Sequence, residues 1–178
     1  RPSEKLCIIG ITGTNGKTTT AHILAHVLTE NGIRCGVIGT VGTMFGGISE
    51  TLSHTTPDAV VLHGIFAKMV EAGITHVVME VSSHSLDLHR VDGIAFDVAI
   101  FTNLTQDHLD YHITMENYKA AKGMLFERAA KSVINMDDAA GAYMKEKSVG
   151  EVLTIGVDTK ADLMAENIDI SAEGTAFD

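Results

Sequence analysis

A glycine-rich segment followed by a lysine and three threonines has the composition of a phosphate-binding loop. The segment runs from Gly10 to Thr20 and reads GITGTNGKTTT. It follows an apolar run and precedes a segment of helical period. In that layout, backbone N–H groups and the helix N-terminus bind phosphates. Lys17 would reach the outer phosphates, and the Thr18 hydroxyl would hold Mg²⁺. The alternative is a glycine-rich turn with a lysine in it by chance.

The loop matches the generic pattern only in part. That pattern has a glycine five residues before the Gly-Lys pair, where this chain has Ile11. The loop is therefore the shorter variant Gly13-x-x-Gly16-Lys17-Thr18. Its placement between an expected strand and an expected helix supports nucleotide phosphate binding.

Two further polar segments have residue types that bind metal ions. Glu80 closes the apolar run HVVME, and an acid there can hold Mg²⁺ directly or through water, or else pair with a lysine or arginine. The segment Asp107–His112, DHLDYH, indicates a metal or phosphate site, or a solvated turn. Zinc is a weaker interpretation, because no spaced Cys or His set completes four ligands. His22 and His26 lack the glutamate of the HExxH pattern, which favours a solvent-facing pair.

Lys122 is the most informative lysine in the sequence. The expected helix from Met115 carries an inward stripe of Tyr118, Ala121, Leu125 and Phe126, and Lys122 lies at i+4 from Tyr118. A lysine beside a buried stripe extends to solvent by default. If it is buried instead, its pKa falls and a neutral amine is available. Such an amine can react with carbon dioxide to give a carbamate, which is a metal-binding anion.

Three more residues are candidates for contact with a substrate. Arg90 follows the same loop as Glu80 and could pair with a carboxylate or phosphate, or form a surface salt bridge. Thr55 and Thr56 could donate hydrogen bonds to a substrate. Capping of the helix that begins in Thr55–Asp58 explains them equally well, with Thr56 or Asp58 as the cap and Pro57 in the first turn.

Strands alternate with helices along the chain, which predicts a mostly parallel three-layer α/β sheet with helices on both faces. The expected strands are Lys5–Ile11, Arg34–Gly39, His76–Val81, Asp97–Thr102, Ser132–Asn135 and Val152–Gly156. The expected helices are Lys17–Asn31, Thr55–Ala72, Met115–Ala130 and Asp138–Lys147. Between them, Thr40–His54 resembles an excursion with a hairpin near Phe45–Ile48. Leu163–Ile170 alternates like the first strand of a small antiparallel appendage.

Ligands of parallel sheets bind beyond the carboxyl ends of the strands. Three polar segments lie at such ends: Thr12–Thr18, Glu80–Arg90 and Asn103–His112. We therefore expect these segments to converge on one site.

Composition excludes several classes of protein. Of the 178 residues, 45% are hydrophobic and 20% are charged, as in a globular domain with a sizeable core. No apolar run approaches the roughly 18 residues of a membrane span, and no signal peptide opens the chain. The net charge of −10 argues against nucleic-acid binding. A polyanionic ligand would need local positive groups and a metal ion to offset that charge.

Cysteine content favours a reducing compartment. Cys7 and Cys35 are the only two cysteines, and both fall in expected strands. This usage is typical of buried thiols in a cytosolic protein rather than of a disulfide scaffold. The chain begins with Arg1 rather than Met, so we expect it to be part of a longer protein.

Taken together, these segments resemble the central domain of the Mur ligases, which build the peptide of the bacterial cell wall. The family's motifs occur in order as GTNGKTTT, TTPD, MEVSSHSLDLHRV, FTNLTQDHLDYH and YKAAKGMLF. The resemblance covers most of Leu6 to Asp137. The combination of TTPD with EVSSH and DHLDYH is most similar to the tripeptide-synthetase (MurE-type) branch.

The resemblance implies a phosphate-loop ATPase fold and an ATP- and Mg²⁺-dependent amide ligase. The branch adds a diamino acid to UDP-N-acetylmuramoyl-L-alanyl-D-glutamate through an acyl phosphate. The ATP-binding residues implied are Gly13, Thr14, Asn15, Gly16, Lys17, Thr18 and Thr19. Those implied around magnesium are Thr18, Glu80, His108 and, if carbamylated, Lys122. The implied catalytic residues are Lys17, Glu80, His108 and Lys122. Those implied for the nucleotide-linked dipeptide are Thr55, Thr56, Ser82 and Arg90.

The resemblance also implies domain boundaries. Residues 1–178 would form one truncated central domain without the family's uridine-binding and amino-acid-binding domains. Such a chain is expected to bind nucleotide without catalysing ligation, in the bacterial cytoplasm. Other family members with a similar loop, the cyanophycin synthetase and folylpolyglutamate synthase types, remain alternatives, as does a nucleotide-binding module without catalysis. The identity of the diamino acid and the oligomeric state are left open by the sequence.

Overall fold

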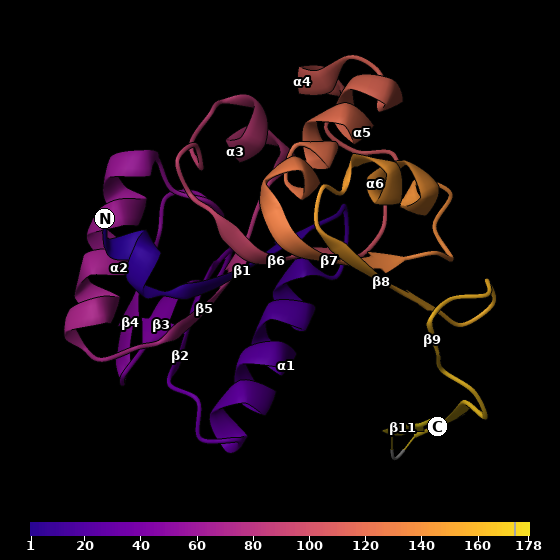
Figure 1. Cartoon of the computed structure of the whole chain (residues 1–178), viewed down its shortest axis with the longest axis horizontal. Coiled ribbons are helices and arrows are strands. Elements are labelled where there is room, and N and C mark those ends of the chain that lie inside the picture. The colour runs from indigo at the N-terminus through magenta and orange to yellow at the C-terminus, as the bar shows by residue number, and fades with distance from the viewer. Residues whose placement is uncertain (173) are drawn as a thin grey trace.

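The chain folds around a nine-stranded sheet (Figure 1). The computed structural model describes residues 1–172 and 174–178. The strand order is β4-β3-β2-β5-β1-β6-β7-β8-β9, and the pairs from β2 to β9 are parallel. The strands are β1 Cys7–Thr12, β2 Cys35–Gly39, β3 Gly42–Phe45, β4 Ile48–Glu50, β5 His76–Glu80, β6 Phe96–Phe101, β7 Ala129–Asn135, β8 Glu151–Gly156 and β9 Leu163–Met164. The predicted α/β class is confirmed.

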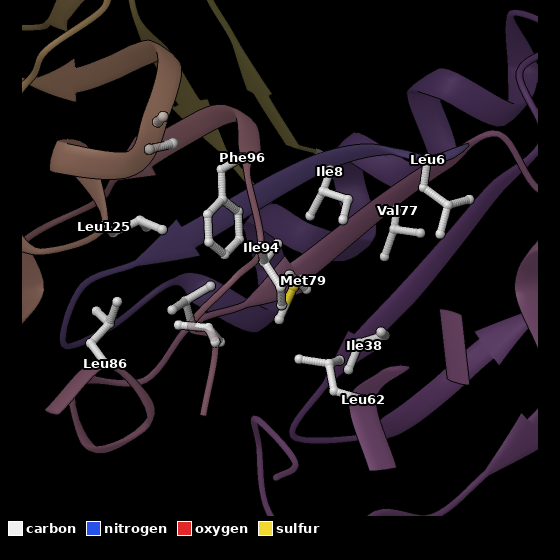
Figure 2. Close-up of a cluster of buried hydrophobic side chains, with 14 of the residues drawn as sticks. Leu6, Ile8, Ile38, Leu62, Val77, Met79, Leu86, Ile94, Phe96 and Leu125 are labelled. Carbon is white, nitrogen blue, oxygen red and sulfur yellow. The ribbon is translucent and has the colours of Figure 1, made fainter. Parts of the chain in front are cut away.

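Helices cover both faces of the sheet, as expected for a parallel sheet whose strands are apolar on both sides. They are α1 Lys17–Glu30, α2 Ala59–Glu71, α3 Ser83–Asp87, α4 Leu109–His112, α5 Met115–Gly123 and α6 Gly141–Lys147, with 3₁₀ turns η1 Pro2–Lys5 and η2 Phe126–Arg128. Helix α1 packs on one face over a cluster that includes Ile11, Val37 and Val78. On the other face, Ile8, Ile38 and Met79 pack with α2, α3 and the segment after α5 (Figures 1 and 2).

The carboxyl ends of the three central strands are in register. Ile11 of β1 pairs with Glu80 of β5, and Thr12 of β1 pairs with Phe101 of β6. The loops that follow these strands therefore leave the sheet at the same edge. This confirms the expected convergence of the glycine-rich loop with the segments after Glu80 and after Phe101.

The predicted boundaries of two helices after β6 were wrong. The helix expected over Met115–Ala130 ends at Gly123, and β7 begins at Ala129, where it pairs with Phe96 of β6. Leu125 and Phe126 lie at the start of the 3₁₀ turn between them and are buried in the hydrophobic core. The burial expected for the stripe is therefore correct, although the helix is shorter. The helix expected over Asp138–Lys147 starts at Gly141, because the Asp138 carboxylate accepts N–H groups of its own turn and of Leu104.

The hairpin expected at Phe45–Ile48 is present as β3 and β4, which extend the sheet antiparallel to β2. The expected strand Leu163–Ile170 is two separate strands. Leu163–Met164 adds to the main sheet as β9, whereas β10 Asp169–Ser171 pairs antiparallel with β11 Gly174–Ala176. The small antiparallel appendage is thus confirmed, with different bounds. Within the described residues, no helix combines the length and apolarity that a membrane crossing needs.

Phe96 offers a test of the core. Its ring is 1% exposed and packs where Gly10 leaves room, since a Cβ at Gly10 would lie 2.8 Å from the ring. Phe96→Ala should therefore lower the free energy of unfolding by about 3–5 kcal/mol through lost burial and a cavity. Urea unfolding would measure this. Val60→Ala, at an 87% exposed position, is the matched control and should change stability by less than about 0.5 kcal/mol. Equal effects of the two changes would contradict this description of the core.

Candidate functional site

The glycine-rich loop joins β1 to α1, as the sequence predicted, and its two glycines adopt backbone angles that favour glycine. Gly13 has φ of 151°, and a Cβ there would lie 1.9 Å from Thr102 Oγ1. Gly16 has φ of 83° and is the N-cap of α1, without a side-chain cap. The first N–H groups of α1 are therefore free of a capping side chain and can bind an anion at the helix N-terminus.

Residues after β6 hold this loop in place. The Thr14 N–H donates to the Asn103 carbonyl, and the Asn15 N–H donates to the Asn103 side-chain oxygen, both at 2.9 Å. The Thr102 hydroxyl donates to the Asn15 carbonyl at 2.7 Å. Sequence reasoning did not assign a role to Asn103; the only signal was its position directly after an expected strand.

Lys17 folds back over its own loop. Its Nζ donates to the carbonyl oxygens of Gly13 and Thr14, both at 2.9 Å. Burial lowers the pKa of Lys17, and the nearby Glu80 and Asp107 carboxylates partly oppose that shift. The Lys17 ammonium therefore lies against the carbonyl groups of its own loop.

Glu80 ends β5 beneath the start of α1 and is 1% exposed. Its two oxygens each accept from Thr18 Oγ1 at 3.0 Å. The Thr40 N–H and hydroxyl donate to the same carboxylate at 2.8 Å and 3.1 Å. Among the described residues Glu80 has no ion-pair partner, so a buried carboxylate is satisfied only by neutral donors. Carboxylate and hydroxyl oxygens are the ligands that a hard cation such as Mg²⁺ prefers, so these residues fit one.

Lys122 does not extend to solvent, contrary to the default interpretation. It is 1% exposed, and its Nζ donates to the Gly13 carbonyl at 2.8 Å. The Nζ also lies 4.3 Å from the centre of the Tyr118 ring, whose hydroxyl is 3.2 Å from Thr14 Oγ1. Burial, followed by the charge of Lys17, lowers the pKa of Lys122 to about 7.

The histidines of the expected polar segment gather between α3 and α5. His108 precedes α4 with φ of 52°, and its ring lies 4.9 Å from His84 and 6.0 Å from Tyr118. The buried His112 Nε2 lies 2.9 Å from Ser83 Oγ. Burial lowers the pKa of both His84 and His112. Within the described ranges, no three His, Cys, Asp or Glu side chains are grouped so as to hold a metal ion by themselves.

Thr55, Thr56, Ser82 and Arg90 lie together beside the end of β5, but the expected start of α2 needs correction. The α2 N-cap is Asp58, which makes no side-chain cap bond and pairs with Arg90 Nε at 3.0 Å. The Thr56 hydroxyl donates to the Glu80 carbonyl at 2.9 Å and accepts the Ser82 N–H, so it does not cap α2. Pro57 consequently precedes the cap rather than entering the first turn.

Four other singled-out residues lie outside this arrangement. His22 is half-buried and His26 exposed, and both line a groove between α1 and the β3–β4 hairpin. Cys7 and Cys35 are free thiols, and they are half-buried rather than fully buried as expected. Both pair in register with His76 of β5 at the opposite edge of the sheet.

Comparison with known proteins places this geometry in a family. The Mur ligase middle domain model matches residues 11–178. The UDP-N-acetylmuramoyl-L-alanyl-D-glutamate--2,6-diaminopimelate ligase of Bacillus cereus is 49% identical over 99% of this chain and 38% of that protein. The protein of the same name from Caldanaerobacter subterraneus is also 49% identical, over 99% of this chain and 37% of that protein. The chain thus spans less than half the length of the curated relatives it matches.

Solved structures agree with the sequence comparison. A structure of a UDP-N-acetylmuramoyl-L-alanyl-D-glutamate--2,6-diaminopimelate ligase superposes with a TM-score of 0.88 at 35% identity, covering 97% of this chain and 36% of that one. MurF from Acinetobacter baumannii superposes with a TM-score of 0.73 at 17% identity, covering 99% and 39%. The similarity to MurF is one of fold alone.

The buried amine predicts a pH-dependent stability. Folding lowers the Lys122 pKa from 10.5 to about 7, so the unfolded chain binds more protons between those values. The cost of burying Lys122 is therefore full below pH 7 and fades as pH rises towards 10.5. Lys122→Met should stabilise the chain more at pH 6 than at pH 9, by about 3 kcal/mol, because the penalty falls by about 1.4 kcal/mol for each of the two pH units above 7.

Urea unfolding in buffer freed of carbon dioxide would measure that difference. The Gly13 carbonyl keeps its bond from Lys17 in the variant, so no buried acceptor is left unpaired. The exposed Lys5 supplies the control, Lys5→Met, which should show no such pH dependence. A Lys122→Met effect that is the same at both pH values would contradict the lowered pKa.

Proposed function

The chain belongs to the Mur ligase family through its middle domain, and we propose that it is the ATP-binding domain of a MurE-type amide ligase. Such an enzyme adds a diamino acid to UDP-N-acetylmuramoyl-L-alanyl-D-glutamate. The proposal is carried by one observation: Lys17, Glu80 and Lys122 meet around one glycine-rich loop at the carboxyl edge of the sheet. The names of relatives that are 44–49% identical to this chain support the acceptor and suggest 2,6-diaminopimelate as the added residue.

The domain assignment is part of the proposal. Residues 1–178 would form the central nucleotide-binding part, and recognition of uridine and of the incoming amino acid would belong to other domains. The chain's 38% share of its relatives' length is consistent with this division. The bacterial cytoplasmic location expected from the sequence stays a prediction.

In the proposed reaction the γ-phosphoryl group of ATP passes to the D-glutamate carboxylate, giving an acyl phosphate. The amine of the diamino acid then attacks the acyl carbon, and phosphate leaves. Residues Gly13 to Thr19 would form the phosphate-binding loop, with the N–H groups at the α1 N-terminus on the phosphates, since those of Thr14 and Asn15 are donated to Asn103. Lys17 would move from the loop carbonyls to the outer phosphate and neutralise charge that develops there.

Mg²⁺ would be held by Thr18, Glu80 and the His108 region, and it would supply Lewis-acid stabilisation of the transferred phosphoryl group. The buried Glu80 carboxylate, which has only neutral donors among the described residues, supports this role. Lys122, when carbamylated, would add a second anionic ligand. Thr55, Thr56, Ser82 and Arg90 would bind the nucleotide-linked dipeptide, and Arg90 would exchange its contact with Asp58 for a substrate anion.

Lys17 provides the first test, in the full-length enzyme. Lys17→Ala should lower the rate of phosphate release in the presence of ATP, the UDP-linked dipeptide and diaminopimelate by at least about 100-fold, because transition-state charge loses its partner. Lys131→Ala, at an exposed position on β7, is the control and should leave the rate unchanged. Unchanged kinetics in Lys17→Ala would refute the assignment. ATP binding without dipeptide-dependent phosphate release in the parent enzyme would favour a module without catalysis.

Lys122 provides the second test. Its pKa of about 7 leaves a large fraction of neutral amine near neutral pH, which can bond to the carbon of CO₂ and release one proton. Carbon-13 NMR of the protein in ¹³C-labelled bicarbonate should show a carbamate signal that is absent in Lys122→Arg. The signal should weaken below pH 7 as the amine becomes protonated. A parent protein without the signal at pH 8 would rule out the modification.

A further inference from the structure

A continuous chain of hydrogen bonds runs from α1 to the segment before α2. Thr18 donates to the Glu80 carboxylate from one side, at 3.0 Å to each oxygen. Thr40, the residue directly after β2, donates to it from the other side through both its N–H and its hydroxyl. The Thr40 hydroxyl oxygen also lies 3.1 Å from Thr55 Oγ1. Thr40 therefore joins the carboxylate to a residue proposed to contact the acceptor substrate.

The backbone at this point is shaped to approach Glu80. A Cβ on Gly39 would lie 2.1 Å from Glu80 Oε1, so a glycine is required before Thr40. The absence of that side chain lets the Thr40 N–H reach the carboxylate at 2.8 Å. Sequence reasoning placed Thr40 in an irregular excursion and gave it no role.

The direction of each hydrogen bond follows from the groups present. A carboxylate only accepts, so the single hydroxyl proton of Thr40 is donated to Glu80. Thr40 Oγ1 can then only accept from Thr55, whose own proton is used in that bond. The Thr55 hydroxyl is left with acceptor lone pairs for anything that binds on its other side.

We propose that Thr40 is a positioning residue that orients the Glu80 carboxylate and makes Thr55 a hydrogen-bond acceptor towards the substrate. This inference rests on the proposed function, in which Glu80 binds the cation and Thr55 the acceptor. It assigns the chemistry of the contact: the acceptor must present an N–H or O–H group to Thr55. Because one hydroxyl proton connects the two sites, binding at Thr55 and cation binding at Glu80 should favour each other, and such coupling is reciprocal.

Cation binding can be measured in the full-length enzyme with ADP and without turnover. Mn²⁺, a hard cation that replaces Mg²⁺, is titrated and its free form is followed by electron paramagnetic resonance. Thr40→Val keeps the N–H and side-chain shape but removes the hydroxyl, and should weaken Mn²⁺ binding about fivefold to tenfold. Thr40→Ser restores the hydroxyl and should return binding to within about twofold of the parent. Thr51→Val, at an exposed threonine after β4, is the matched control and should bind as the parent does.

The acceptor contact is measured in the full-length enzyme. Thr40→Val should raise KM for the UDP-linked dipeptide about fivefold or more, measured at saturating ATP and Mg²⁺. The Thr40→Val/Thr55→Val double variant should be little worse than either single variant, because both changes interrupt one chain. Thr40→Ser should again restore the parent value.

The inference is overturned if Thr40→Val equals Thr51→Val in Mn²⁺ affinity or in KM for the UDP-linked dipeptide. It is also overturned if Thr40→Ser fails to restore Mn²⁺ binding, or if the increases in KM of the two single variants multiply in the double variant. Should Thr40→Val fail to fold, Thr55→Val takes its place in the Mn²⁺ titration. Mn²⁺ binding by Thr55→Val that equals binding by the parent then overturns the inference. Failure of the proposed function has a different signature. In that case the parent full-length enzyme releases no phosphate on addition of dipeptide, whereas the Mn²⁺ measurement still decides the role of Thr40.

Discussion

Two lysines share one backbone oxygen, and the site depends on that contact. Lys17 and Lys122 both donate to the Gly13 carbonyl, at 2.9 Å and 2.8 Å. The Lys122 contact connects α5 to the loop. Position 13 itself requires glycine, because a side chain there would overlap Thr102. Two ammonium groups on one acceptor repel each other in a buried place. The cost of burying the charge, and after it the repulsion from Lys17, disappears when Lys122 loses its proton, which is why its pKa lies near 7.

The negative charge of Glu80 lies at the other end of the same loop, beside Thr18. Glu80 is buried against Thr18 and Thr40 without an ion pair in the part of the chain that the structure describes. A chain of net charge −10 thus has a local cationic loop and an isolated anion side by side. A polyphosphate and a divalent cation together match this pair of charges, whereas either alone would leave one of them uncompensated.

Residues with local signals could be placed from the sequence. The loop glycines, Lys17 and Glu80 sit at strand ends that apolar runs define, and the period of the Tyr118 stripe placed Lys122 beside the core. Contacts that tertiary structure alone creates could not be placed. The helix that carries Lys122 ends at Gly123, because the following residues must turn back to the sheet so that Ala129 can pair with Phe96 of β6. Thr40 lies in no motif, and Asn103 lies in a motif that did not indicate its partner, so only the register of parallel strands reveals what they bind.

The proposed phosphate contacts and the proposed acceptor contacts use different kinds of groups, and this difference affects acceptor specificity. In the proposed function, phosphate contacts would come mainly from backbone groups of one loop, which the fold supplies whatever the neighbouring side chains are. Structures as distant as 17% in identity share that fold. The proposed acceptor residues are different, because Thr55 and Thr56 are hydrogen-bonded to Thr40 and to the Glu80 carbonyl. A change of acceptor at this face would also disturb the carboxylate that the cation needs, so acceptor recognition and catalytic geometry must change together.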